Sequence, residues 1–361
     1  MSGDVSLKID AGRRRGRGAV SNTTSRYEPS REEIQDGWEI DEERAAFRTF
    51  VEEERPRSVI TRNTSPDLPF DRSINPYRGC EHGCIYCFAR PTHAYLGYSP
   101  GLDFETRIVA RPLAAQVLDR ELRKRGYAPA VMAMGTNTDP YQPVERQYRI
   151  MRKVLEVLRD FRHPVAIVTK GTLIERDIDI LGEMAADGLV HVGLSVTTLD
   201  DETSRRMEPR VPRPVRRLKT MERLASAGIP VRVMMAPVVP SITDHEIEHI
   251  LEASRDSGAT AASWIMLRLP REVSPLFREW LEEHYPDRAA RVMARVQEMH
   301  GGQDYDAQWG KRMRGEGFYA EIIAQRFEVA RKRFGMAESL PKLRTDLFEV
   351  PLAKGDQLAL F

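Results

Sequence analysis

The stretch Asn75–Arg90 reads NPYRGCEHGCIYCFAR and contains every cysteine of the 361-residue chain. Cys80, Cys84 and Cys87 are spaced at i, i+4 and i+7. Three cysteines are an odd number, and this spacing is too tight for a disulfide framework. Soft thiolates gathered in this way select zinc, copper(I) or an iron–sulfur cluster. The motif therefore predicts a metal centre in a loop.

The ligand count separates these metals. A structural zinc site takes four ligands, usually as two pairs far apart in sequence, and the chain has no second cysteine pair. Zinc would therefore need His82 or His93 as a further ligand. A [4Fe–4S] cluster normally takes four thiolates, so three would leave one iron open to a cofactor or substrate. We favour the cluster and keep zinc as the alternative.

Outward from this loop, short apolar runs alternate with amphipathic segments. We predict strands at 72–77, 130–135, 164–169, 189–196, 231–236 and 261–267, with helices at 113–125, 144–161, 177–186, 215–227 and 244–257. This alternation predicts an α/β fold with a buried parallel sheet. Six βα units can curve into a partial (βα)6 barrel of TIM type, although a flat doubly wound sheet has the same local pattern. In a barrel, the cysteine loop would lie at the carboxyl ends of the strands, where such folds place their chemistry.

The flanking sequence predicts three parts. Residues 1–65 are polar and basic and predict an irregular arm, residues 66–270 the barrel, and residues 271–361 a helical segment and tail. Helices are expected at 274–284, 287–299 and 317–334. The stretch 305–319 interleaves Trp309, Phe318 and Tyr319 with basic residues, which suits either stacking on nucleic-acid bases or packing against the barrel.

Composition excludes several classes of protein. The chain is 41% hydrophobic and 30% charged, with a net charge of +1, as in a soluble globular protein. No apolar run approaches the roughly 18 residues of a membrane span, and the N-terminus lacks a secretory h-region. We therefore expect a cytoplasmic protein that does not bind membranes. Basic clusters at 13–17 and 205–219 would either contact a phosphate backbone or remain solvated.

The motif also resembles a known family. CxxxCxxC directly after a first strand, with Tyr86 before the last cysteine, resembles the signature of the radical S-adenosylmethionine (SAM) superfamily, and residues 70–270 resemble its partial barrel. Within it, NPYRGCEHGCIYC and GTNTDPYQPVE (135–145) resemble the branch related to spore photoproduct lyase, often labelled DNA-repair photolyases.

The resemblance implies a cofactor pair and a reaction. Cys80, Cys84 and Cys87 would hold a [4Fe–4S] cluster whose open iron chelates the methionine moiety of SAM. One electron, supplied by an external reductant of the flavodoxin or ferredoxin type, would release a 5′-deoxyadenosyl radical that abstracts hydrogen from the substrate. Nucleic acid, a peptide and a small metabolite are the alternative substrates. A non-catalytic iron–sulfur or zinc protein is the alternative to an enzyme.

The resemblance further assigns SAM-binding roles near the strand ends. Gly135, Thr136, Asn137 and Thr138 would bind the amino group, Ser195 and Thr197 the ribose or carboxylate, Glu208 the ribose, Arg210 the carboxylate, and Tyr86 would flank the adenine. The alternatives are a turn or a helix cap for the small polar residues and a surface ion pair for Glu208 and Arg210.

One departure limits the resemblance. Spore photoproduct lyase is understood to use a further cysteine as a hydrogen donor, and this chain has no fourth cysteine. Tyr141, Tyr77 and Tyr305 are the candidate donors, with Tyr141 as our choice of catalytic residue. Thymine-dimer repair is therefore not predicted.

Overall fold

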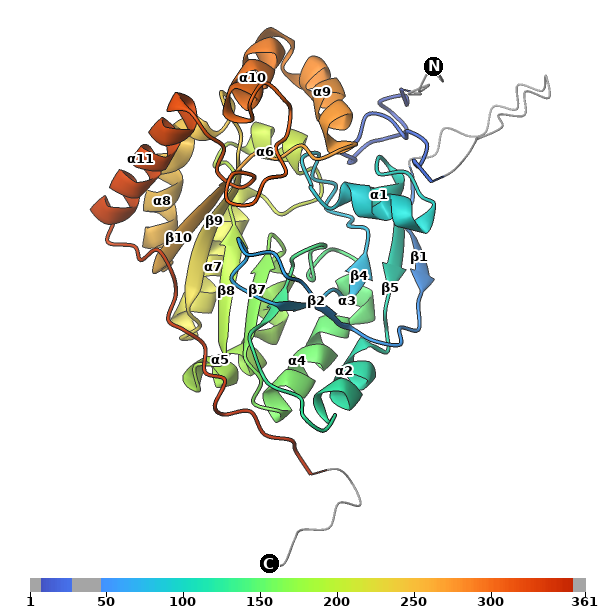
Figure 1. Cartoon of the computed structure of the whole chain (residues 1–361), viewed down its shortest axis with the longest axis vertical. Coiled ribbons are helices and arrows are strands. Elements are labelled where there is room, and N and C mark those ends of the chain that lie inside the picture. The colour runs from blue at the N-terminus through green and yellow to red at the C-terminus, as the bar shows by residue number, and fades with distance from the viewer. Residues whose placement is uncertain (1–7, 28–46, 353–361) are drawn as a thin grey trace, which may run out of the picture.

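The computed structural model describes residues 8–27 and 47–352 (Figure 1). Its main sheet has the strand order β10-β9-β8-β7-β6-β3-β2. The strands are β2 Ile60–Arg62, β3 Arg72–Ile74, β6 Met132–Met134, β7 Val165–Thr169, β8 Val190–Ser195, β9 Val231–Val238 and β10 Ala261–Met266. The six strands from β3 to β10 are parallel, as predicted, and β2 pairs antiparallel at one edge.

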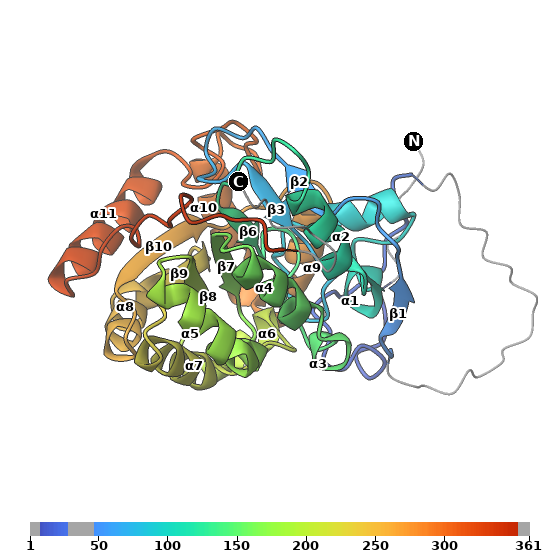
Figure 2. The ribbon, with the colours of Figure 1, turned by 90° about the horizontal axis from the view of Figure 1, so that it is seen from below.

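One set of helices covers one face of this sheet (Figure 2). It consists of α2 Ala114–Leu122, α4 Ile150–Asp160, α5 Ile178–Ala186, α7 Pro214–Ser226 and α8 Ile247–Asp256. Apolar strand residues such as Val192 and Val233 are fully buried against this layer. A doubly wound sheet carries helices on both faces, so the one-sided layer indicates an open, partial barrel. The predicted fold class is confirmed.

A smaller sheet, in the order β1-β5-β4, lies beside the barrel. Its strands are β1 Phe50–Glu53, β4 Tyr77–Arg78 and β5 Arg107–Ala110. The single strand predicted at 72–77 is therefore wrong. The chain leaves β3 at Asn75, and β4 pairs with β5 in the other sheet. The arm 1–65 is not wholly irregular either, because β1 and β2 lie within it.

Short elements connect these layers. They are η1 Arg90–Leu96, α1 Asp103–Thr106, α3 Glu145–Tyr148, η2 Thr172–Asp177, α6 Asp201–Met207 and η3 Asp244–Glu246. The helix predicted at 144–161 is divided into α3 and α4, because Arg149 between them has a left-handed backbone with φ of 50°.

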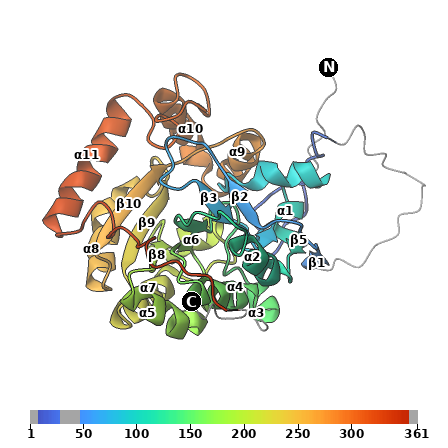
Figure 3. The same cartoon turned by 60° about the horizontal axis from the view of Figure 1, so that its bottom comes forward.

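The C-terminal segment is helical, as predicted. It contains α9 Val273–His284, α10 Pro286–Met299 and α11 Phe318–Arg333. Figure 3 shows α9 and α10 on the opposite side of the strands from α5 and α7. Phe277 and Trp280 of α9 share an apolar cluster with Ile85 and Tyr86 of the cysteine loop, so this segment supports the loop. Within the described ranges, no helix is both long and apolar enough to cross a lipid bilayer.

Candidate functional site

The three cysteines are free thiols in a largely buried loop. Cys80 and Cys84 are 7% and 8% exposed, and Cys87 is half-buried. Burial raises the pKa of all three thiols, so the site favours neutral sulfur unless a bound cation stabilises the thiolates. A positively charged metal centre would supply that stabilisation.

Gln142 holds the first cysteine from both sides. Its side chain is completely buried. The Oε1 atom accepts a hydrogen bond from the Glu81 amide at 2.9 Å, and Nε2 donates to the Gly79 carbonyl at 3.2 Å. These two peptide groups flank Cys80. Gln142 belongs to the segment 135–145, but its hydrogen-bond partners cannot be read from its position in the sequence.

Arg90 holds the second half of the loop. Its guanidinium donates to the carbonyls of Gly83 at 3.2 Å and Cys84 at 3.0 Å. It also forms a fully buried ion pair with Glu105, with Nη2 and Oε1 separated by 2.6 Å. Because a buried guanidinium needs its charge balanced, Glu105 fixes Arg90, and Arg90 fixes the loop.

The N-terminal segment closes over this ion pair. Glu105 accepts hydrogen bonds from the amides of Gly18 and Ala19, each at 2.9 Å. A Cβ atom on Gly18 would lie 1.9 Å from the Gly83 carbonyl oxygen, so only glycine allows this approach. Arg17 is 8% exposed and donates to the Glu105 carbonyl at 2.8 Å. Both interpretations of the basic cluster at 13–17 are therefore wrong for Arg17, which stabilises the loop.

Lys170 connects the strand ends to the cysteine loop. Its Nζ donates to Ser195 Oγ at 2.9 Å and to the Ala236 carbonyl at 3.4 Å. The same nitrogen lies 5.7 Å from the centre of the Tyr86 ring. The carboxyl ends of β7, β8 and β9 therefore meet beside the aromatic ring that precedes Cys87. The alternative of a helix cap is wrong for Ser195, because Asp200 caps α6.

Glu208 lies at the centre of a buried polar network. Its Oε1 accepts hydrogen bonds from the Tyr86 hydroxyl and, at 2.9 Å, from Thr197 Oγ1. Its Oε2 lies 2.8 Å from Nη2 of Arg217, and both side chains are fully buried. Burial alone would raise the pKa of Glu208, but Arg217 and Lys170 outweigh it and lower the pKa. Glu208 is therefore a carboxylate at neutral pH.

This network rules out one alternative interpretation. Glu208 and Arg210 do not form a surface ion pair with each other, because Glu208 is buried against Arg217. Arg210 instead lies 3.2 Å from Glu81 Oε1, on the other side of the loop. Sequence reasoning missed Arg217, because its position in an arginine-rich segment suggested solvent or phosphate. Other arginines of that segment form ion pairs within the chain. Arg213 pairs with Asp201, and Arg216 pairs with Glu175.

In the loop after β6, the backbone at Gly135 lies very close to the backbone of β7. Gly135 has φ of 82°, and a Cβ atom there would lie 1.8 Å from the Val168 carbonyl oxygen. Thr138 is buried and donates to the Tyr77 carbonyl at 3.0 Å. Thr136 and Asn137 are half-buried, and their side chains make no hydrogen bonds to any part of the chain that the structure describes. The alternative that these residues cap the next helix is wrong, because Val144 occupies the N-cap position of α3.

Asp139 links this loop to the cysteines. Its carboxylate lies 3.3 Å from Nδ1 of His82 and accepts hydrogen bonds from Thr169 Oγ1 at 2.6 Å and the Lys170 amide at 2.7 Å. Burial opposes ionisation, but His82 and these donors lower the pKa of Asp139 to about 2. A charged Asp139 therefore fixes the cysteine loop against β7.

The three candidate tyrosines lie in different surroundings. Tyr141 is 1% exposed, and its hydroxyl donates to Asp177 Oδ2 at 3.1 Å. Tyr77 is fully buried, and its hydroxyl donates to Glu145. Tyr305 is half-buried and lies near Arg312, whose pKa is raised chiefly by the hydrogen bond to Asp67 and to a smaller extent by Tyr305. The first two hydroxyls are thus held by carboxylates.

The stretch 305–319 leaves two of its aromatic rings in solvent. Trp309 is 58% and Phe318 is 72% exposed, so the expectation that these aromatics pack against the barrel is wrong for both. Arg312 forms a two-pronged ion pair with Asp67 at 2.6–2.7 Å, which ties this stretch to the loop before β3.

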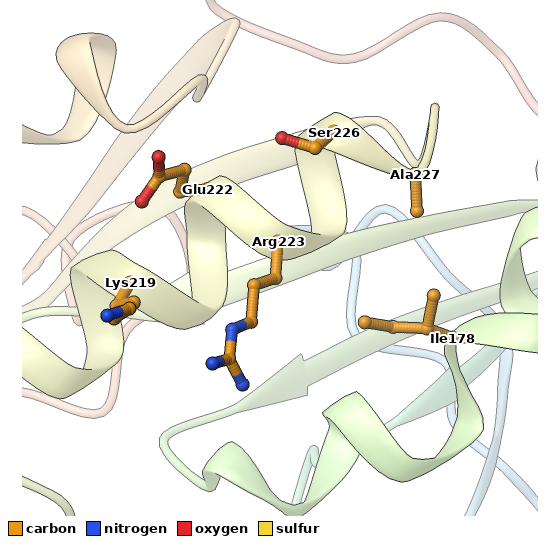
Figure 4. A pocket seen from close by; sticks show the side chains of 6 residues that line it. All are labelled: Ile178, Lys219, Glu222, Arg223, Ser226 and Ala227. Atoms are coloured by element: carbon orange, nitrogen blue, oxygen red, sulfur yellow. The ribbon is translucent and has the colours of Figure 1, made fainter.

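Two further observations concern where ligands could bind. A surface hollow between α5 and α7 is lined by Ile178, Lys219, Glu222, Arg223, Ser226 and Ala227, none of them in the network above (Figure 4). Among the described residues, no three His, Cys, Asp or Glu side chains converge as they would on one metal ion. An iron–sulfur cluster does not require such convergence, because each thiolate binds a different iron.

Comparison with known proteins identifies the family. The family model described as the radical SAM superfamily matches residues 74–253, from the end of β3 into α8. The chain belongs to the radical SAM superfamily. The resemblance noted in the cysteine motif is thereby confirmed, and superfamily membership implies a [4Fe–4S] cluster and SAM as cofactors.

Two sequence relatives are themselves described as uncharacterized. A protein of Mycobacterium tuberculosis (strain H37Rv) is 39% identical over 226 residues, covering 62% of this chain and 66% of that protein. The match thus spans slightly less than two thirds of the relative. A protein of Methanocaldococcus jannaschii is 25% identical over 215 residues, covering 59% of this chain and 76% of that protein.

Among solved structures, spore photoproduct lyase complexed with dinucleoside spore photoproduct is similar in fold. Its TM-score is 0.54 at 14% identity, over 79% of this chain and 80% of that one. At this identity the similarity establishes a shared fold only. It supports the partial barrel and leaves the substrate open.

Proposed function

We propose that this radical SAM protein is an enzyme that holds one [4Fe–4S] cluster on Cys80, Cys84 and Cys87 and uses it to cleave SAM. When bound, the cluster would pass one electron to the sulfonium C5′–S bond of SAM, giving methionine and a 5′-deoxyadenosyl radical that takes hydrogen from the substrate. The observation that carries the proposal is the buried loop of three free thiols, fixed by Gln142 and Arg90 at the carboxyl end of the barrel.

The chain's own residues would bind and orient SAM. The side chains of Thr136 and Asn137 have donors and acceptors to spare and suit the amino group of the methionine moiety. Gly135, which has no side chain, would let the backbone of this loop come close to SAM, and Thr138 fixes the loop. Arg210, which is 33% exposed on its side chain, suits the carboxylate.

A second group would position the first. Ser195 accepts a hydrogen bond from Lys170, and Thr197 donates to Glu208, which in turn accepts from Tyr86, so that the ring beside Cys87 has one orientation. We assign these residues to the SAM pocket through these contacts. Buried polar groups that hold one another in this way favour a single arrangement, which a reactive radical needs. The electron donor proposed for this site is a flavodoxin- or ferredoxin-type protein.

The test is reductive SAM cleavage by protein reconstituted with iron and sulfide under anaerobic conditions. Iron and sulfide are measured per chain, dithionite and SAM are added, and 5′-deoxyadenosine is quantified by chromatography. We expect about four irons per chain and 5′-deoxyadenosine from the wild type. Cys84→Ala, checked for folding by circular dichroism, should release none.

Two outcomes would contradict the proposal. Protein that retains zinc and no sulfide would refute the cluster. A complete cluster that leaves SAM intact, with and without a flavodoxin system, would refute the catalytic role and leave an iron–sulfur carrier.

A further inference from the structure

The two faces of the parallel sheet differ in their access to water. Residues that face the helices, such as Val192, Val233 and Met235, are fully buried. Alternate residues on the inner face, such as Val168 and Met234, are half-buried. A Cβ atom on Gly193 would lie 2.8 Å from Met234 Sδ and 3.4 Å from Val168 Cγ2, which places all three residues on the same inner face. The inside of the open barrel is therefore accessible to solvent.

Arg232 lies on this inner face. It precedes Met234 by two residues on β9, and side chains two apart on a strand share a face. Its register partners are Gly193 on β8 and Ala261 on β10. Both neighbours are small, so neither extends a side chain over the guanidinium, and Met234 and Val168 fill the space beside Gly193.

No counterion balances Arg232. Its Nε is buried without a hydrogen-bond partner, and the guanidinium makes no ion pair with any described residue. Burial lowers its pKa, and no acidic group acts in the opposite direction. Arg90 and Arg217, two fully buried arginines, each have a buried carboxylate. Arg232 is half-buried, and a partly buried charge without a partner is unfavourable, so its presence needs a reason other than stability.

Two more polar groups face the same region. Ser263 on β10 pairs in register with Met234, two residues from Arg232, and its Oγ is buried without a partner. His191 lies two residues before Gly193 on β8. Burial and the charge of Arg232 lower the pKa of His191 to about 4, so its ring is neutral at pH 7 and can donate one hydrogen bond. A cation and two neutral hydrogen-bonding groups thus line one part of the inner face.

We propose that Arg232, Ser263 and His191 bind the oxyanion, a phosphate or carboxylate, of a small anionic substrate. Arg232 stands near the start of β9, whereas Lys170 and Ser195 stand at the strand ends. The anion would therefore lie deeper in the barrel than the SAM pocket, with the reacting carbon nearer the strand ends. The inference rests on the proposed function, because the position of the reacting carbon assumes that SAM is cleaved at the strand ends. A small metabolite could reach this depth directly, whereas duplex nucleic acid would have to extrude a nucleotide to do so.

The test is anion binding to the reconstituted protein in the absence of SAM and reductant. Melting temperature is followed against sodium phosphate and, separately, sodium acetate, with sodium chloride keeping the ionic strength constant. The variants are Arg232→Met and, as a matched control, Arg205→Met, which changes an exposed arginine on α6. We expect the wild type and the control to be stabilised equally, and the half-saturating concentration to rise about ten-fold or more in Arg232→Met. The anion with the lower half-saturating concentration identifies the substrate group.

A second measurement separates binding from structure. In chloride alone, Arg232→Met should melt no lower than the wild type, because it removes an unpaired charge. If that variant does not fold, Ser263→Ala should still weaken anion binding in a folded protein.

Equal anion responses in the wild type, the control and Arg232→Met would overturn the inference, as would a wild type that neither anion stabilises. A wild type that cleaves SAM without Arg232-dependent binding refutes this inference alone. One that binds the anion but leaves SAM intact refutes the proposed function alone.

Discussion

Gln142→Leu is the sharpest test of how the cysteine loop is held. Leucine keeps most of the volume of the completely buried side chain but leaves the Glu81 amide and the Gly79 carbonyl without partners. Each orphaned buried group costs about 1–3 kcal/mol, so the pair should cost about 2–6 kcal/mol. For a protein of this size the melting temperature should fall by roughly 3–8 °C.

The cluster should respond as well, because both orphaned groups flank Cys80. We expect reconstituted Gln142→Leu to hold less iron and sulfide per chain than the wild type and to lose them faster in air. Gln147→Leu, an exposed position on α3, is the matched control and should change stability by no more than about 0.5 kcal/mol. Gln142→Leu with wild-type iron content and melting temperature would show that Gln142 does not position the loop.

Three further changes test other parts of the structure. Glu105→Gln leaves Arg90 buried without a counterion, so urea unfolding should show a loss of about 3–5 kcal/mol, and trypsin should cleave faster after Arg17; unchanged cleavage would contradict the role given to the N-terminal segment. The hydrogen bond from Arg278 outweighs burial and lowers the pKa of Asp304 to about 2, so the stability it contributes is present above about pH 4 and is lost as pH falls through about 2. Asp304→Asn should therefore melt below the wild type at pH 7 but not near pH 2 in the metal-free protein, and a gap independent of pH would refute this. Gly135→Ala should cost about 2–5 kcal/mol in chemical denaturation, because its methyl group would meet the Val168 carbonyl. Gly126→Ala, at φ of 81° with no atom within 4 Å, should cost only the backbone strain of about 1–3 kcal/mol, so equal losses would contradict the steric argument.

The alternation of strands and helices was predictable because its signal is local. Each βα unit of the core reveals itself through the hydrophobic period of a single segment. Whether the sheet was flat or curved was not predictable, since that depends on which face each helix covers. Strands β1 and β4 were missed for a related reason. They have two to four residues, too few to show a period, and both pair with β5, which follows them in the chain.

The site was predictable only where one segment carries it. Three cysteines within eight residues predict a metal-binding loop. The residues that hold this loop through ion pairs and hydrogen bonds come from distant segments. Glu105 and Gly18 are far apart in sequence, and the segment around Gly18 has the composition of a solvated arm. In the sequence, Arg217 cannot be distinguished from the arginines near it, and only the fold shows that it is buried against Glu208. Buried ion pairs are set by the fold, so a sequence shows their members but not their pairing.

Charged residues in the interior of this molecule fall into two groups, those paired within the chain and one that has no partner among the described residues. Arg90, Arg217 and Asp139 each have an opposite charge or a ring of donors, and each holds a segment in place. The structural role of such groups is sufficient to account for them, because removing either partner would leave an unpaired charge. Arg232 is half-buried and lacks such a partner in the part of the chain that the structure describes, on the face of the sheet that water reaches. A charge of this kind gains its partner only when a ligand binds. A ligand oxyanion held there would share the weakly screened interior of the barrel, so its affinity should depend less on ionic strength than binding at the exposed arginines of α6.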